Sequence, residues 1–163
     1  MKKLLLAVAL VATPAMALDT TITGNVQSKC VINTDTAGVY GNPNAYKLST
    51  AVEDGGVQPI IRFDTSIAGA YKARVTTPTS FSTSPSLSDT VTWSGSTTLK
   101  KFSDAAMSDY ETNKVTYDAT TEFNMHTAGS AWFAVDSTAE YGGNKALPGG
   151  TYRSVVVAEC IAN

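Results

Sequence analysis

The stretch LPGGTYRSVVVAEC, from Leu147 to Cys160, decides the fold predicted for this chain. A Pro-Gly-Gly turn leads into a run of β-branched residues, which favours a strand over a helix end. A last strand this apolar is expected to pack in the middle of the domain. The other cysteine, Cys30, lies near the start of the chain. We therefore expect the first and last strands to lie close together and to be joined by a disulfide.

The first 17 residues have the pattern of a secretory signal peptide. Lys2 and Lys3 precede a short apolar run over residues 4–12, and residues 15–17 have the small-x-small form of a cleavage site. The apolar run is too short to span a bilayer, and no later segment is long enough. We expect an exported chain whose mature part, residues 18–163, is a single domain that is not embedded in a membrane.

Export sets the expected state of the two cysteines. Two cysteines in an exported chain most often pair, so Cys30 and Cys160 are predicted to form a disulfide with Cα atoms about 5–6 Å apart. The alternative is a pair of free, buried thiols. No Cys-x-x-Cys motif is present, so the spacing indicates neither a redox centre nor a zinc ribbon.

Charge and composition limit the classes of molecule that the chain is expected to bind. Removal of the signal peptide takes away Lys2 and Lys3, which leaves ten basic residues against fourteen acidic ones and a formal charge of −4. This balance argues against nucleic acid or an anionic membrane surface as a partner. Charged residues are sparse, and small and β-branched residues are frequent, as is typical of exported β proteins.

Alternating residues separated by turn signals predict eight or nine short strands and one helical turn. The strands are expected over residues 18–34 (as one or two strands), 57–63, 70–77, 90–93, 97–102, 113–117, 121–125, 131–135 and 151–160, with a further short strand as an option at 46–48 and the helical turn at 103–110. Ser94-Gly95-Ser96 is interpreted as a turn and residues 136–149 as a loop. This spacing predicts an all-β sandwich of Greek-key type.

Few residues could carry chemistry, and no enzyme or cofactor is expected. His126 is the single histidine, and we expect it at a strand end near the surface, although a Ser-His-Asp triad would have to use it. The aspartates at 104, 109, 118 and 136 are spread apart, so a calcium site would have to be assembled across loops. Trp93 and Trp132 fall in strand patterns and are predicted to be core residues, with a sugar-binding platform as the alternative.

The two ends of the mature chain carry a family resemblance. The segment TITGNV (residues 21–26) followed by CVIN (residues 30–33) resembles the mature N-terminus of exported bacterial pilin subunits. The ending, with GGTY (residues 149–152) and VVV (residues 155–157), is similar to the final strand of fimbrial and spore-coat-U-like subunits. The chain departs from many pilins in placing its second cysteine on the last strand.

The resemblance implies an immunoglobulin-like sandwich that lacks one strand. In chaperone–usher pilins the N-terminal extension of the next subunit fills the gap by strand addition. The candidate donor segment is residues 18–26, with Ile22, Gly24 and Val26 on one face. The alternative is that this segment is the first strand of its own complete sandwich.

Two classes of function therefore stay open. The first is a structural subunit of a cell-surface fimbria or pilus, with a role in cell adhesion. Its expected partners are identical or related subunits, a periplasmic chaperone and an outer-membrane usher, and its route leads through the periplasm to the cell surface. The second is a self-contained exported binding module whose ligand is a carbohydrate, calcium or another envelope protein.

Overall fold

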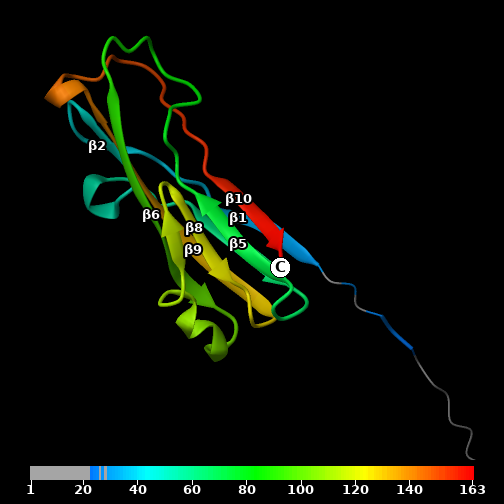
Figure 1. Cartoon of the computed structure of the whole chain (residues 1–163). Coiled ribbons are helices and arrows are strands. Elements are labelled where there is room, and N and C mark those ends of the chain that lie inside the picture. Colours follow the sequence, from blue (N-terminus) through cyan, green and yellow to red (C-terminus); the bar gives the residue numbers. More distant parts are fainter. Residues whose placement is uncertain (1–22, 26, 28) are drawn as a thin grey trace, which may run out of the picture.

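The structure is a computed structural model, and it describes residues 23–25, 27 and 29–163. The predicted signal peptide (residues 1–17), Ile22 and Val26 lie outside the described residues. Two antiparallel sheets dominate the described part, which confirms the all-β sandwich (Figure 1).

The strands divide into a larger and a smaller sheet. The first sheet contains β1 (Cys30–Thr36), β2 (Gly41–Asn44), β3 (Lys47–Ser49), β4 (Ile60–Thr65), β6 (Val91–Phe102) and β9 (Gly129–Tyr141). The second sheet contains, in spatial order, β10 (Val157–Ala162), β5 (Tyr71–Thr76), β8 (Thr120–Asn124) and β7 (Val115–Tyr117). Three short 3-10 helices join them: η1 (Val52–Asp54), η2 (Ala105–Tyr110) and η3 (Gly142–Asn144).

Strand β9 holds the first sheet together. Along one edge it pairs with β6 from Ala131 to Tyr141. Along the other edge it pairs first with β4, over residues 129–134, and then with β3, over residues 138–140. Strand β1 extends the sheet beyond β4, and β2 extends it beyond β3. On one side of β9 the first sheet therefore forks into two branches, β4 with β1 and β3 with β2. On the other side, β6 alone runs along β9.

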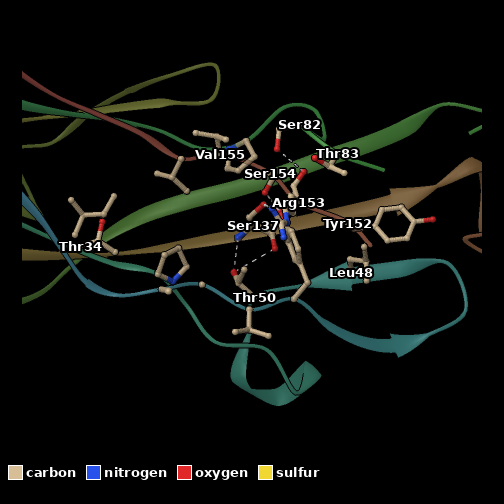
Figure 2. Close-up of a pocket in the computed structure, with 18 of the residues that line it drawn as sticks. Thr34, Leu48, Thr50, Ser82, Thr83, Ser137, Tyr152, Arg153, Ser154 and Val155 are labelled. Atoms are coloured by element: carbon tan, nitrogen blue, oxygen red, sulfur yellow. Dashed lines mark hydrogen bonds between the residues drawn. The ribbon is translucent and has the colours of Figure 1, made fainter. Parts of the chain in front are cut away.

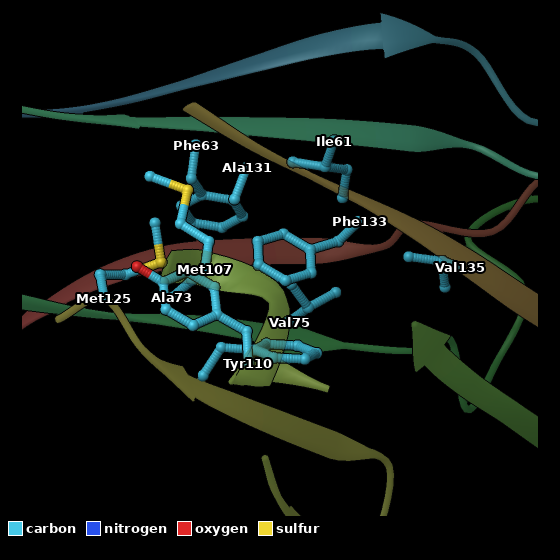
Figure 3. Packing of buried hydrophobic residues seen from close by; sticks show 11 residues of the cluster. Ile61, Phe63, Ala73, Val75, Met107, Tyr110, Met125, Ala131, Phe133 and Val135 are labelled. Atoms are coloured by element: carbon cyan, nitrogen blue, oxygen red, sulfur yellow. The ribbon is translucent and has the colours of Figure 1, made fainter. Parts of the chain in front are cut away.

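The core lies between the two sheets where alternate residues point inward. Phe63, Phe133 and Ile61 from the first sheet face Val75 from the second (Figure 3). Phe123 of the second sheet belongs to the same cluster. The Phe133 ring lies 5.7 Å from that of Phe63, edge to face, and 4.2 Å from that of Phe123. Helix η2 covers one end of this core with two fully buried side chains, Met107 and Tyr110.

The disulfide between Cys30 and Cys160 is confirmed. It joins the first residue of β1 to β10, with the Cα atoms 6.2 Å apart. The two strands belong to different sheets and run side by side at the edge of the sandwich (Figure 1). The bond therefore ties the edge of one sheet to the edge of the other.

Three predictions about strands were wrong. The Ser94-Gly95-Ser96 segment is not a turn but the middle of β6, because Gly95 lets the chain pass close to β9: a Cβ atom there would lie 2.6 Å from the Asp136 carbonyl oxygen. Strand β9 continues to Tyr141, through part of the predicted loop. The last strand begins only at Val157, and it lies at a sheet edge rather than in the middle.

The tryptophans do not lie in the inter-sheet core, so that prediction was wrong. Trp132 alternates with the buried Ala131 and Phe133 and so points to the outer face of the first sheet, half-buried. There it lies between the cationic groups of Arg62 and Lys101, 5.9 and 4.8 Å from the ring centroid, and its indole N–H donates to Asp35.

Trp93 has a different position from the one predicted. It is half-buried and stands directly opposite Ala139 in the β6–β9 pair, so it points to the inner face. Its ring packs edge to face on Phe81, with centroids 4.7 Å apart, and Phe81 packs on Tyr152. The partners of Trp93 are therefore loop residues rather than the second sheet.

The disulfide is expected to contribute much of the stability. It closes a loop of 130 residues, and in the chain-entropy model such a loop contributes about 4–5 kcal/mol. The double variant Cys30→Ala/Cys160→Ala should lose that amount in urea unfolding. An unchanged free energy of unfolding would show that the bond does not constrain the unfolded chain.

Neighbouring residues on opposite faces of β9 give a second prediction. Phe133→Ala should lower the free energy of unfolding by about 3–5 kcal/mol, because it leaves a cavity in the core. Trp132→Ala should cost only about 1–2 kcal/mol, because it removes contacts on an open face. Equal losses in denaturant unfolding would contradict the assignment of the two faces.

Candidate functional site

A groove with a volume of about 860 Å³ opens along the edge of the sandwich. It runs between the segment that follows β1 and the segment that precedes β10. Figure 2 shows Thr34 near one end, Leu48 and Tyr152 near the other, and Ser137 with Ser154 between them. The groove is thus a long trough rather than a round cavity.

The walls of the groove are a strand edge and an extended segment that leads into a strand. One wall is β1 with residues 37–40; β1 stands at the end of its sheet and pairs only with β4. The other wall is residues 150–156, which bond to Ser82 and Thr83 through Arg153. Within the described part of the chain, the main-chain groups of residues 154–156 pair with no strand. Both walls can therefore offer main-chain hydrogen bonds to a strand between them.

The floor of the groove is the inner face of the first sheet where the sheet forks. Ile61 of β4, Leu48 of β3 and Pro59 supply apolar surface, and Thr50 and Ser137 supply hydroxyl groups. Thr50 bridges the fork, because its main-chain N–H donates to the Ser137 carbonyl and its hydroxyl accepts from the Ser137 N–H. The floor is therefore rigid, apolar toward both ends and polar in the middle.

An inward-facing isoleucine on β1, beside the groove, is left partly uncovered. Ile32 stands opposite the fully buried Phe63 in the β1–β4 pair, so its side chain points to the inner face of the sheet. Even so, 36% of Ile32 is exposed, whereas Ile61 is only 5% exposed. In the described part of the chain, β1 pairs with β4 alone.

Tyr40 crosses the middle of the groove. Its hydroxyl forms hydrogen bonds with Ser137 Oγ on the floor, at 2.9 Å, and with Ser154 Oγ on the opposite wall, at 2.6 Å. Further along, the Tyr152 hydroxyl donates to the Pro148 carbonyl, and burial raises the pKa of this phenol. The raised pKa keeps the Tyr152 phenol neutral at physiological pH.

The predicted site residues are only partly brought together. The Cys30–Cys160 bond lies at the base of the two strands that continue into the groove walls. Gly24 is exposed, and a Cβ atom added to it would meet nothing within 4 Å. The described residues before β1 lead away from the domain (Figure 1). Ile22 and Val26 stay predictions, because they lie outside the described residues.

The other candidates for chemistry lie away from the groove. His126 follows β8 and is exposed, as predicted; its ring nitrogens contact Asp109 Oδ1 at 2.8 Å and Thr127 Oγ1 at 3.0 Å. Among the described residues, no three histidine, cysteine or acidic side chains gather where they could hold a metal ion.

The sequence predictions missed the groove because its lining combines predicted strands with segments predicted as loops. Tyr40 and Thr50 lie in the Gly- and Asn-rich region after β1, and no periodic pattern marks them. One signal was present: the run from Val155 to Val157 places valines on both faces of a strand, as is typical of a strand covered on both sides.

The open groove predicts unequal costs for two isoleucines. Ile32→Ala should lower the free energy of unfolding by less than about 1 kcal/mol, because the side chain is partly solvated already. Ile61→Ala should cost about 2–5 kcal/mol, because it removes buried methyl groups. Equal losses in chemical denaturation would indicate that something covers Ile32 in the isolated domain.

Comparisons with known proteins give no relative from which to assign the groove. The chain matches no family model, no curated protein and no solved structure. Within the residues that the structure describes, no helix has the length and apolar character needed to span a membrane. The function of the groove is therefore argued from its geometry and from the sequence pattern.

Proposed function

We propose that the protein is a structural subunit of a cell-surface fibre. In this proposal, residues 18–26 of one copy lie as a strand in the groove of another, and repetition of this contact builds the fibre. The observation that carries the proposal is the groove itself, which lies between the edge strand β1 and the extended segment that leads into β10, with apolar side chains on its floor.

The groove has the features that strand addition needs. Main-chain groups on the walls supply affinity, and the spaces between wall side chains receive alternate side chains of the added strand. Ile61 lines the apolar end of the groove, and the partly exposed Ile32 lies beside that end on β1, two residues before the lining residue Thr34, so an aliphatic side chain added there would remove apolar surface from water. Leaving this surface open in a free monomer would favour association.

The N-terminal segment has matching features. Residues 18–26 would span about 30 Å as a strand. Ile22, Gly24 and Val26 alternate with the polar Thr21, Thr23 and Asn25, so one face is suited to the groove and the other to water. Gly24 and its described neighbours, residues 23 and 25, are exposed, which supports action in trans rather than on the parent domain.

The proposal also specifies partners and location. A periplasmic chaperone would protect the groove before assembly, and an outer-membrane usher would order the addition of subunits. The disulfide fits an oxidising, exported setting, where bonds of this kind persist. The mature subunit would then lie in a fimbria at the cell surface.

A substitution in the donor segment tests the proposal. In a protein comprising residues 18–163, Ile22→Asp places a carboxylate in an apolar groove, where it has no partner. Assembly should fail in size-exclusion chromatography with light scattering, with subunit affinity weakened at least about 100-fold. The matched control is Thr23→Asp, which places the same charge on the solvent face and should still assemble.

Thermal unfolding of the monomer separates the two roles of the segment. Ile22→Asp should leave the melting temperature of the isolated monomer nearly unchanged if the segment acts in trans. A large drop would show that residues 18–26 form a strand of their own domain, and the fibre proposal would then fail. A sharp monomer for the unsubstituted chain at high concentration would also count against it.

A further inference from the structure

One residue connects the floor of the groove to its far wall. Tyr40 follows β1 and belongs to one wall, Ser137 lies on β9 in the floor, and Ser154 belongs to the other wall. The Tyr40 hydroxyl bonds to both serine hydroxyls, at 2.9 and 2.6 Å. A single phenol thus links two segments that lie 97 and 114 residues from it in the chain.

This link lies where a strand in the groove would have to pass. In Figure 2, Ser137 and Ser154 lie between Thr34 at one end and Tyr152 at the other. The bridging phenol therefore divides the trough into a part near Ile61 and a part near Leu48. A strand that lies along the whole trough needs the space between Ser137 and Ser154 for its own backbone and inward side chains.

We propose that Tyr40 is a latch that holds the walls of the empty groove together and that an incoming strand must release. This inference rests on the fibre function proposed above and adds a means of regulating it. The latch closes the groove without filling it, since only the Tyr40 side chain crosses it. Release frees the Ser154 wall and joins the two parts of the trough.

The strength of the latch suits a reversible gate. Both bonds join neutral hydroxyls, and such bonds contribute modestly to stability in water. Ser137 is only 2% exposed while Tyr40 is bonded to it, so the closed groove keeps water from its hydroxyl. Two bonds of this kind correspond to a roughly 10–30-fold preference for the closed groove. The latch should therefore slow strand uptake without preventing it.

The test measures the rate at which the groove takes up a peptide. The acceptor is a chain of residues 18–163 carrying Ile22→Asp, so that its own segment cannot act as donor. The probe is a fluorescently labelled synthetic peptide of residues 18–29, followed by anisotropy after rapid mixing. The variants are Tyr40→Phe, which removes only the hydroxyl, Ser154→Ala, and the two combined.

A tyrosine outside the groove provides the matched control. Tyr117 lies on β7 and its hydroxyl bonds to Glu122, so Tyr117→Phe makes the same chemical change at a distant strand. This variant should take up the peptide at the parent rate. Thermal unfolding of every variant shows that the acceptors are folded, and Ser154→Ala keeps the test valid if Tyr40→Phe is unstable.

The latch predicts a specific set of rates. Tyr40→Phe removes both bonds and should accelerate uptake roughly 10–30-fold, whereas Ser154→Ala removes one bond and should accelerate it by a smaller factor. The double variant should be no faster than Tyr40→Phe alone, because that change already removes the Tyr40–Ser154 bond. Uptake at the parent rate, or slower uptake, would overturn the latch and leave the fibre function intact. Failure of every folded acceptor to bind the peptide would overturn the fibre function and the latch with it.

Discussion

The hydrogen bonding of β9 is the constraint on which the rest of the structure depends. This strand is long enough to pair with β6 along one edge and with β4 and β3 in succession along the other. Because β4 and β3 cannot both continue past the middle of β9, the sheet forks there, and Thr50 fills the fork with hydrogen bonds to Ser137. The fork forms the floor of the groove, so the open surface follows from how β9 is shared.

The sequence predicted the class of fold more accurately than the course of individual strands and the faces of their side chains. Alternating residues identified β4, β5 and β8 to within a few residues, because strands with one buried face carry a period of two. The Cys30–Cys160 pair could be predicted from export and an even count. Gly95 was wrongly assigned to a turn, because the sequence alone does not distinguish a glycine that permits close approach between strands from a glycine in a turn. Trp132 was misread as core because its position on β9 shows the face only when the register is known.

The groove could not be predicted from the sequence for a physical reason. Its walls are edges that lack a neighbour, and the absence of a neighbour leaves no periodic pattern in the chain. Its floor combines residues from three separate segments, and only the fold brings Ile61, Leu48 and Ser137 together. One sign of the groove was present in the sequence, in the valines at 155–157. They have the pattern of a strand that is covered on both faces, and yet Val155 is 58% exposed.

The position of the disulfide has a mechanical consequence. The N-terminal segment joins the domain at Cys30, the first residue of β1, so tension applied to that segment enters there. Without a crosslink, such tension would peel β1 from β4 one hydrogen bond at a time. Because Cys30 is bonded to Cys160, the load is divided between the β1–β4 ladder and the β10–β5 ladder in the opposite sheet. Both ladders must then break before the N-terminal segment can be pulled from the domain. The covalent bond therefore makes β1 resistant to separation by pulling.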